Sequence, residues 1–342
     1  MTGDRPDRAR AGAKHVALLA GVSTATVSRA LNNPETVDPA TLQRVRDAVA
    51  KLRYVPHGVA RSLRSRRSKM VGAIVPSFDY ALYARTTSAL QQRLAERGYA
   101  LVLAEHHYDL EQELQLTRQL IEHGVDAFVF VGTEHDSRLF ALLDEFGRPF
   151  VLTWGVDAPE GRPCVGFDNR AAGYEMARHL VKLGHKRFGI VSAPIDGNDR
   201  GRERGAGFRA ALAEAGLSVP DSHVQYARIT LAAAEEAMQR LLAAKPRPTA
   251  VLATNDVLAV GAMLACRKAG VRIPDDISIT GVDNTDLGAT QTPGLTSVRT
   301  PIVEIGDAAA EQIVARLEGR DAPAHLALPF EIVLRGSTAP PP

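Results

Sequence analysis

A short segment near the N-terminus carries the side chains best suited to contacting the edges of DNA bases. Residues 24–29 (TATVSR) combine hydroxyl groups with a guanidinium, which hydrogen-bond to bases and phosphates. Ser23 precedes them as a typical N-cap, and Gly21 suits a turn with positive φ. A helix that starts at Thr24 would present these groups to a major groove. The candidate DNA-contacting residues of this segment are Ser23, Thr24, Ala25, Thr26, Ser28, Arg29 and Asn32.

Two further helices are predicted to hold that segment in place. Residues 14–20 have apolar positions at helical spacing, and the second helix is expected to end near residue 31. Asp38-Pro39 then opens a third helix that runs through Leu52, with Asp38 as its cap and Pro39 at the first helical position. Three short helices within about 40 residues predict a helix-turn-helix unit.

The charge distribution favours a polyanionic partner for this part of the chain. Of 342 residues, 41 are Lys or Arg and 39 are Asp or Glu, so the net charge is +2. Residues 1–70 hold 14 basic and five acidic residues, a balance of +9, which leaves −7 for residues 71–342. A solvated basic tail is the alternative, but this region is also patterned for helices. A plain three-helix bundle would not explain its charge.

The remaining 270 or so residues alternate between strand-like apolar runs and amphipathic helical windows. The alternation predicts parallel, doubly wound α/β sheets, whose ligands bind beyond the carboxyl ends of the strands. The expected strands are 70–76, 99–105, 127–132, 150–154, 164–168, 188–193, 223–227, 250–254 and 277–282. The expected helices include 84–97, 111–123, 170–183, 203–215, 231–244 and 255–269.

Several classes of protein have little support in the sequence. No apolar run is long enough to span a bilayer, and the charged N-terminus does not resemble a signal peptide, which favours a cytoplasmic protein. The two cysteines exclude a disulfide scaffold. GAGFRA (205–210) fits a dinucleotide fingerprint but falls inside a helical window, and His106-His107 lacks a second metal-ligand pair. We therefore predict no cofactor and no enzymatic activity.

The N-terminal strings resemble the DNA-binding head of LacI/GalR-family transcriptional regulators. AGVSTATVSR (20–29) and YVPHGVARSL (54–63) carry the resemblance. It implies a hinge helix over 59–63 that lies in the minor groove, with Leu63 as an apolar wedge and nearby arginines on phosphates. Gly12 stands where the family usually has Thr, and His57-Gly58 replaces the usual pair before the hinge. Residues that the resemblance adds to the DNA contacts are Tyr54, Val59, Ala60, Arg61, Leu63 and Arg64.

The resemblance continues to about residue 337 and implies a two-lobed, periplasmic-binding-protein-like effector domain. Strings such as RERGAGFRAAL (202–212) and AVLATNDVLAVGAM (250–263) support it. The lobes would be joined by crossings near 166–169, 297–301 and 322–326. The implied layout is a disordered arm (1–13), a helix-turn-helix domain (14–56), a hinge and linker (57–69), an effector-binding and dimerisation domain (70–337) and a tail (338–342).

The expected effector-binding residues lie at strand ends. Arg204, Asn255 and Asp283 are carried over from the family pattern. The aromatic residues Tyr80, Tyr83 and Trp154 could stack on a sugar ring. Asn255 and Asp283 could equally be capping residues, Trp154 a core residue, and Asp168 part of the lobe crossing. Arg228 either faces an anionic ligand or is an exposed residue at a strand end. The full set is Tyr80, Tyr83, Trp154, Asp168, Arg204, Arg228, Asn255 and Asp283.

The sequence thus predicts a ligand-responsive transcriptional regulator, most simply a repressor, that binds a palindromic operator in double-stranded DNA as a homodimer. Its effector would be a sugar or sugar derivative, and no membrane partner is expected. A solute-binding protein for transport is the alternative from another class, which the body alone would permit. A sugar-modifying enzyme is a more distant alternative, because no nucleophile or acid–base pair is visible.

Overall fold

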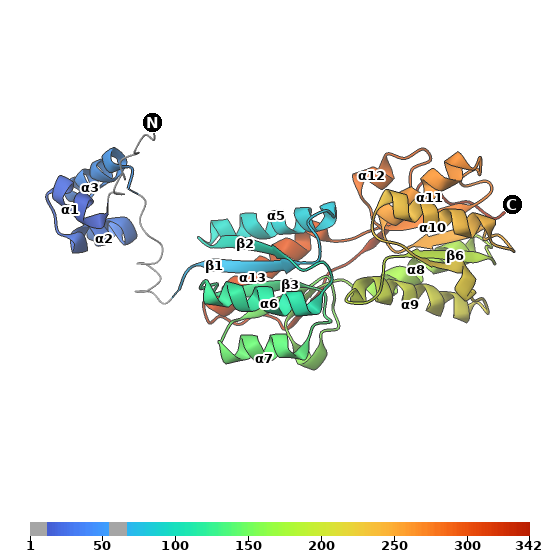
Figure 1. The fold of residues 1–342 in the computed structure, drawn as a ribbon, viewed down its shortest axis with the longest axis horizontal. Coiled ribbons are helices and arrows are strands. Elements are labelled where there is room, and N and C mark those ends of the chain that lie inside the picture. The colour runs from blue at the N-terminus through green and yellow to red at the C-terminus, as the bar shows by residue number, and fades with distance from the viewer. Residues whose placement is uncertain (1–11, 55–66) are drawn as a thin grey trace, which may run out of the picture. The chain divides into compact units, whose positions relative to one another are not determined.

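The computed structural model describes residues 12–54 and 67–342, without the side chains of Asn32 and Glu160. The chain divides into two compact units, Met1–Ser68 and Lys69–Pro342 (Figure 1). The expected hinge residues Val59, Ala60, Arg61, Leu63 and Arg64 lie outside the described residues, as do residues 1–11 of the expected arm.

The first unit contains the three predicted helices. Ser23 caps the second helix by accepting a hydrogen bond from the Thr26 amide, and Asp38 caps the third by accepting from the Thr41 amide. Val16, Val27 and Val45 are fully buried between the helices. The first helix begins at Ala13, so the prediction of a disordered arm over 1–13 was wrong for its last residue. The elements are α1 (Ala13–Ala20), α2 (Thr24–Asn32), η1 (Pro34–Thr36) and α3 (Pro39–Leu52).

The second unit consists of two α/β lobes, each built on a six-stranded sheet. All strands of the first sheet are parallel, in the order β11-β5-β4-β3-β1-β2. Strands β1 and β3 are buried almost throughout, because helices cover both faces of the sheet. Its strands are β1 (Met70–Val75), β2 (Ala100–Glu105), β3 (Ala127–Val131), β4 (Phe150–Thr153), β5 (Cys164–Gly166) and β11 (His325–Ala327). Its helices are α5 (Ala81–Glu96), α6 (Leu110–Glu122), α7 (Ser137–Glu145), η2 (Pro159–Gly161) and α13 (Ile302–Leu317).

The second sheet has the order β12-β10-β9-β8-β6-β7 and is parallel except for its edge strand β12, which pairs antiparallel with β10. The predicted α/β class with parallel doubly wound sheets is confirmed. Its strands are β6 (Phe188–Ser192), β7 (Val224–Tyr226), β8 (Ala250–Ala253), β9 (Ser278–Asp283), β10 (Thr296–Arg299) and β12 (Glu331–Val333). Its helices are α8 (Asn169–Lys182), α9 (Asp199–Glu214), η3 (Asp221–His223), α10 (Leu231–Ala243), α11 (Asp256–Lys268) and α12 (Asp286–Ala289).

The chain passes between the lobes three times. It leaves β5 at Gly166 and enters α8 at Asn169, and it leaves β10 at Arg299 and enters α13 at Ile302. The third passage runs between β11 and β12, over residues 328–330, so the predicted position at 322–326 was wrong. Residues 322–326 lack a distinctive pattern because β11 is a short edge strand with two of its three residues exposed.

Two other boundaries differ from the prediction. The backbone amide of Lys69 donates to Asp126 Oδ2 (2.7 Å), so the first lobe starts one residue earlier. The expected tail at 338–342 is joined to the second lobe, because the buried His185 contacts the Ala339 carbonyl (2.9 Å) and Ser278 Oγ donates to the same oxygen (3.1 Å). Within the described residues, no helix is long and apolar enough to cross a membrane.

Candidate functional site: a DNA-recognition helix and an interlobe pocket

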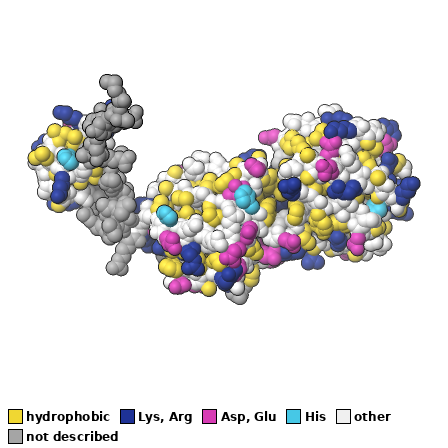
Figure 2. All heavy atoms as spheres, viewed as in Figure 1, with side chains coloured by type: hydrophobic (Ala, Val, Ile, Leu, Met, Phe, Trp, Pro, Cys, Tyr) yellow, Lys and Arg dark blue, Asp and Glu magenta, His cyan; other side chains and the backbone are white. Residues whose placement is uncertain are grey.

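The second helix of the first unit presents polar side chains to solvent. Thr24, Ala25 and Arg29 are exposed, whereas Val27 and Ala30 are buried against the other two helices. The Ser23 and Thr26 hydroxyls lie 2.9 Å apart at the start of the helix. Lysine and arginine side chains also lie on the visible face of this unit (Figure 2). Tyr54 is half-buried against the helical core, which makes it a packing residue as well as a DNA-contact candidate.

In the second unit, a pocket lies where the carboxyl ends of the two parallel sheets face each other. Tyr80 follows β1, Trp154 follows β4 and Asn255 follows β8. Parallel strands place the loops after them on one edge of the sheet, so both lobes contribute to one site. The lining residues are Tyr80, Leu82, Tyr83, Tyr108, Trp154, Ala193, Asn198, Arg200, Gly201, Arg204, Ile229, Thr254 and Asn255.

Tyr80 and Asp283 join the two lobes directly. The Tyr80 hydroxyl, from the start of α5, donates a hydrogen bond to Oδ2 of Asp283, at the end of β9. Oδ1 of Asp283 lies 3.6 Å from Nη2 of Arg204. Burial raises the pKa of Asp283 to about 7, because the nearby Arg204 charge only partly offsets the loss of hydration. Burial, together with Asp283, also raises the pKa of Tyr80 well above its usual value.

Arg204 is positioned by an unusually close contact between α8 and α9. A Cβ at Gly207 would lie 2.0 Å from the Arg170 carbonyl oxygen, and one at Gly173 would lie 2.2 Å from the Arg204 carbonyl oxygen. Only glycine at both positions allows the two backbones to approach this closely. Arg204 then donates from Nε to Asn169 Oδ1 (2.8 Å) and from Nη1 to the Thr254 carbonyl (2.8 Å).

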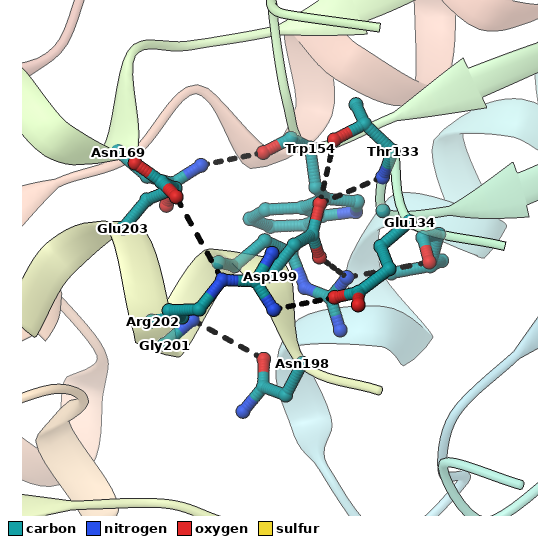
Figure 3. Close-up of polar contacts among 12 residues, drawn as sticks. Thr133, Glu134, Trp154, Asn169, Asn198, Asp199, Gly201, Arg202 and Glu203 are labelled. Atoms are coloured by element: carbon teal, nitrogen blue, oxygen red, sulfur yellow. Dashed lines mark hydrogen bonds and ion pairs between the residues drawn. The ribbon is translucent and has the colours of Figure 1, made fainter. Parts of the chain in front are cut away.

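A second group of contacts joins the lobes through the start of α9 (Figure 3). Oδ2 of Asp199 accepts hydrogen bonds from the backbone amide (2.7 Å) and hydroxyl (2.8 Å) of Thr133, which follows β3. Burial opposes the charge of Asp199, but Arg200 and the Thr133 amide outweigh it and lower its pKa. Gly132 has φ +104°, a conformation that favours glycine, and a Cβ there would lie 2.3 Å from Arg200 Nη1, so a side chain at this position would displace the guanidinium.

The aromatic wall of the pocket comes from the first lobe. Tyr83 makes edge-to-face contacts with both Tyr80 (5.5 Å between ring centroids) and Trp154 (6.0 Å). Trp154 is fully buried with φ +71°, and its carbonyl accepts from Asn169 Nδ2 (2.7 Å; Figure 3). The pocket holds about 20 Å³ of water-accessible space, and one water needs about 10–15 Å³. A sugar ring therefore requires the lobes to separate.

The structure brings six of the eight expected effector residues to this site. Trp154 belongs to the core and to the pocket, and Asn255 both lines the pocket and caps α11 by accepting from the Leu258 amide (2.9 Å). Of the two roles expected of Asp168, the structure agrees with the one at the lobe crossing: the side chain is exposed, lies outside the pocket lining and caps α8 by accepting from the Ala171 amide (2.7 Å). Of the two roles expected of Arg228, the structure agrees with the exposed residue at a strand end, and its neighbour Ile229 lines the pocket instead.

Sequence reasoning missed Asn169, Arg200 and Tyr108. Asn169 directly follows the helix cap, and Arg200 lies in the first turn of α9, which begins four residues before the predicted helix. Tyr108 follows β2, so the rule that ligands lie beyond strand ends could have found it. His106, expected in a solvated loop, is 2% exposed, and the described residues contain no group suited to a metal ion.

A helix-turn-helix unit followed by two α/β lobes around a polar cleft defines a DNA-binding regulator with a ligand-binding domain. Residues 14–57 match the family "Bacterial regulatory proteins, lacI family", and residues 177–338 match the "Periplasmic binding protein-like domain". The chain belongs to the LacI family of transcriptional regulators, as the relatives below also show.

Two curated relatives and one solved structure cover almost the whole chain. The HTH-type transcriptional repressor PurR of Escherichia coli is 31% identical over 332 residues, which is 96% of this chain and 97% of PurR. The HTH-type transcriptional regulator GntR of Pseudomonas aeruginosa is 34% identical over 94% of each chain. The structure of a transcriptional regulator CelR–cellobiose complex has a TM-score of 0.71 at 31% identity and covers 96% of this chain and 100% of CelR.

Proposed function

We propose that this protein is a repressor whose affinity for operator DNA is controlled by a small hydroxylated molecule bound between the lobes. The observation that carries the proposal is the hydrogen bond across the cleft from the Tyr80 hydroxyl to Asp283, two residues that are 203 positions apart. A ligand that inserts between these side chains must change the separation of the lobes, and its differential affinity for the two arrangements drives the change. PurR is named a repressor, and the CelR structure is a complex with cellobiose, so these relatives support a repressor with a sugar-like ligand.

The operator is proposed to be nearly palindromic and to be bound by a homodimer. One recognition helix reads only a few base pairs, so two helices related by a two-fold axis are needed for a specific site. Thr24, Ala25 and Arg29 would contact base edges, because all three are exposed on α2, with Thr24 and Ala25 in its first turn and Arg29 in its last. The effector would contact Arg204, Asn255 and Asp283 through its hydroxyl groups.

The test combines operator selection with a ligand screen. Fragments selected from genomic DNA by the full-length protein should contain a two-fold repeat, and ultracentrifugation should give two chains per fragment. A thermal-shift screen of sugars, sugar acids, sugar phosphates and nucleobases identifies ligands, since a bound ligand stabilises by RT ln(1 + [L]/Kd). A ligand from that screen should change operator affinity measured by fluorescence anisotropy. A stable monomer on the selected DNA would refute the dimer, and operator affinity that ignores every bound ligand would refute the switch.

A further inference from the structure

Arg200 is a buried cation whose donors are only partly used. Its side chain lies in the first turn of α9, lines the interlobe pocket and is 4% exposed. Nη1 donates to Asp199 Oδ1 (2.5 Å) and to the Val131 carbonyl (3.3 Å). Nη2 is buried and makes no hydrogen bond among the described residues, although Tyr83 and Tyr108, which line the same pocket, are close enough to raise the pKa of Arg200. An unpaired buried donor on a charged group is costly, so its retention in a pocket indicates that something accepts from it.

A second unpaired donor lines the same pocket. The indole Nε1 of Trp154 is buried and has no partner among the described residues, although the side chain is fully enclosed. Trp154 comes from the first lobe and Arg200 from the second, so the two side chains line the cavity from opposite lobes. A group that accepts from both must carry at least two acceptor atoms, as a carboxylate or a phosphate does.

The acceptors around this pocket do not neutralise Arg200 and Arg204 fully. Asp199 already accepts three hydrogen bonds, two of them from Thr133 in the opposite lobe (Figure 3). Asp283 is the other carboxyl group, and with a pKa raised to about 7 it is only partly ionised at neutral pH. Two arginines therefore face the cavity with less than two negative charges, which favours an anionic ligand.

We propose that the effector is a hydroxylated small molecule with a carboxylate or phosphate group, and that Arg200 binds this anion together with the Trp154 indole. This inference rests on the proposed function, because it concerns the ligand of the same cleft. It moves the anion-binding role expected of Arg228 to a residue 28 positions earlier. The hydroxyl groups of the ligand would then lie toward Arg204 and Asn255.

The competing explanation is that Arg200 only holds the lobes together through Val131, Tyr83 and Tyr108 of the first lobe. The two explanations differ in their ligand dependence. A residue that only closes the lobes affects acidic and neutral ligands equally, whereas a residue that contacts the anion affects the acidic ligands alone. Thr133→Val serves as the matched control for lobe closure, because it removes an interlobe hydrogen bond to Asp199 without removing a charge.

Isothermal titration calorimetry of the full-length protein provides the test. The probes are D-gluconate, D-glucuronate and D-glucose 6-phosphate, each compared with D-glucose, so that the carboxylate and phosphate arms are separate. At least one acid should bind at least about tenfold more tightly than glucose. Arg200→Gln should lower the binding affinity for that acid by about 10- to 100-fold, the range for a hydrogen bond to a charged group. Arg228→Ala, which removes an exposed charge outside the pocket, should leave the affinity for that acid unchanged.

Three results would overturn the inference: glucose binding as tightly as every acid, no acid binding at all, or Thr133→Val weakening the acid as much as Arg200→Gln does. Arg200→Lys guards against a folding defect, because it keeps a charge beside Asp199 and should retain the wild-type melting temperature while losing acid affinity. Operator binding separates this inference from the proposed function. If an acid binds through Arg200 but operator affinity does not respond, the proposed function fails and the anion site stands. If glucose alone releases the operator, the proposed function stands and the anion site fails.

Discussion

Replacing Asp283 with Asn should change how the stability of the ligand-free protein depends on pH. Asp283 is 1% exposed and faces Tyr80 from α5, Arg204 from α9 and, at longer range, Asp256 from α11. Burial raises its folded-state pKa from 3.8 to about 7, so the folded protein holds this proton more tightly than the unfolded chain. The Asp283 contribution to stability is therefore most favourable below about pH 4 and declines as the pH rises to about 7.

The expected size follows from the pKa difference. A rise of about three units corresponds to about 4 kcal/mol, at about 1.4 kcal/mol per unit. Asn has no charge to bury and keeps an oxygen that can accept from the Tyr80 hydroxyl. We therefore expect Asp283→Asn to exceed the wild type in unfolding free energy by up to about 4 kcal/mol at pH 7.5, and the difference to disappear toward pH 4.

The assay is urea denaturation from pH 4 to 8, followed by the fluorescence of Trp154, the single tryptophan, which lies in the same pocket. Asp168→Asn is the matched control, because it makes the same chemical change at an exposed helix cap and should follow the wild type throughout. A constant difference between Asp283→Asn and the wild type at all pH values would refute the reasoning, since it would mean that Asp283 is ionised in the folded protein across the whole range.

Three other substitutions test the packing, the lobe contact and the DNA surface. Gly207→Ala should lower the unfolding free energy by at least about 2 kcal/mol in chemical denaturation, because its Cβ meets backbone at 2.0 Å, whereas Gly205→Ala, with nothing nearer than 3.9 Å, should be tolerated. Gly132→Ala should enlarge the ligand-free protein in small-angle scattering by keeping the lobes apart; the same result with Gly124→Ala, which has φ +84° and no atom within 4 Å, would assign the effect to backbone strain alone. Arg29→Ala should cost roughly 1–3 kcal/mol on the preferred operator in anisotropy titrations and less on random DNA. Equal losses on both would make Arg29 a phosphate contact.

The sequence alone determined the helix-turn-helix unit and the order of strands and helices. These features depend on interactions within a few residues, such as the caps at Ser23 and Asp38 and the apolar spacing between Asp38 and Leu52. Alternating strands and helices also fixed the edge of each sheet at which a ligand would bind, since parallel strands all end on the same side. Arg204, Asn255 and Asp283 could be named from that rule and the family resemblance.

Only the tertiary structure decided which of two neighbouring residues enters the pocket. Asp168 caps α8 while Asn169 contacts Arg204, and Arg228 is exposed while Ile229 lines the cavity. One position of sequence turns a side chain about 100° around a helix or to the opposite face of a strand, and local patterns do not set strand and helix ends to that precision. The hydrogen bond between Tyr80 and Asp283 joins residues 203 positions apart, so it exists only because the tertiary structure brings the two lobes together.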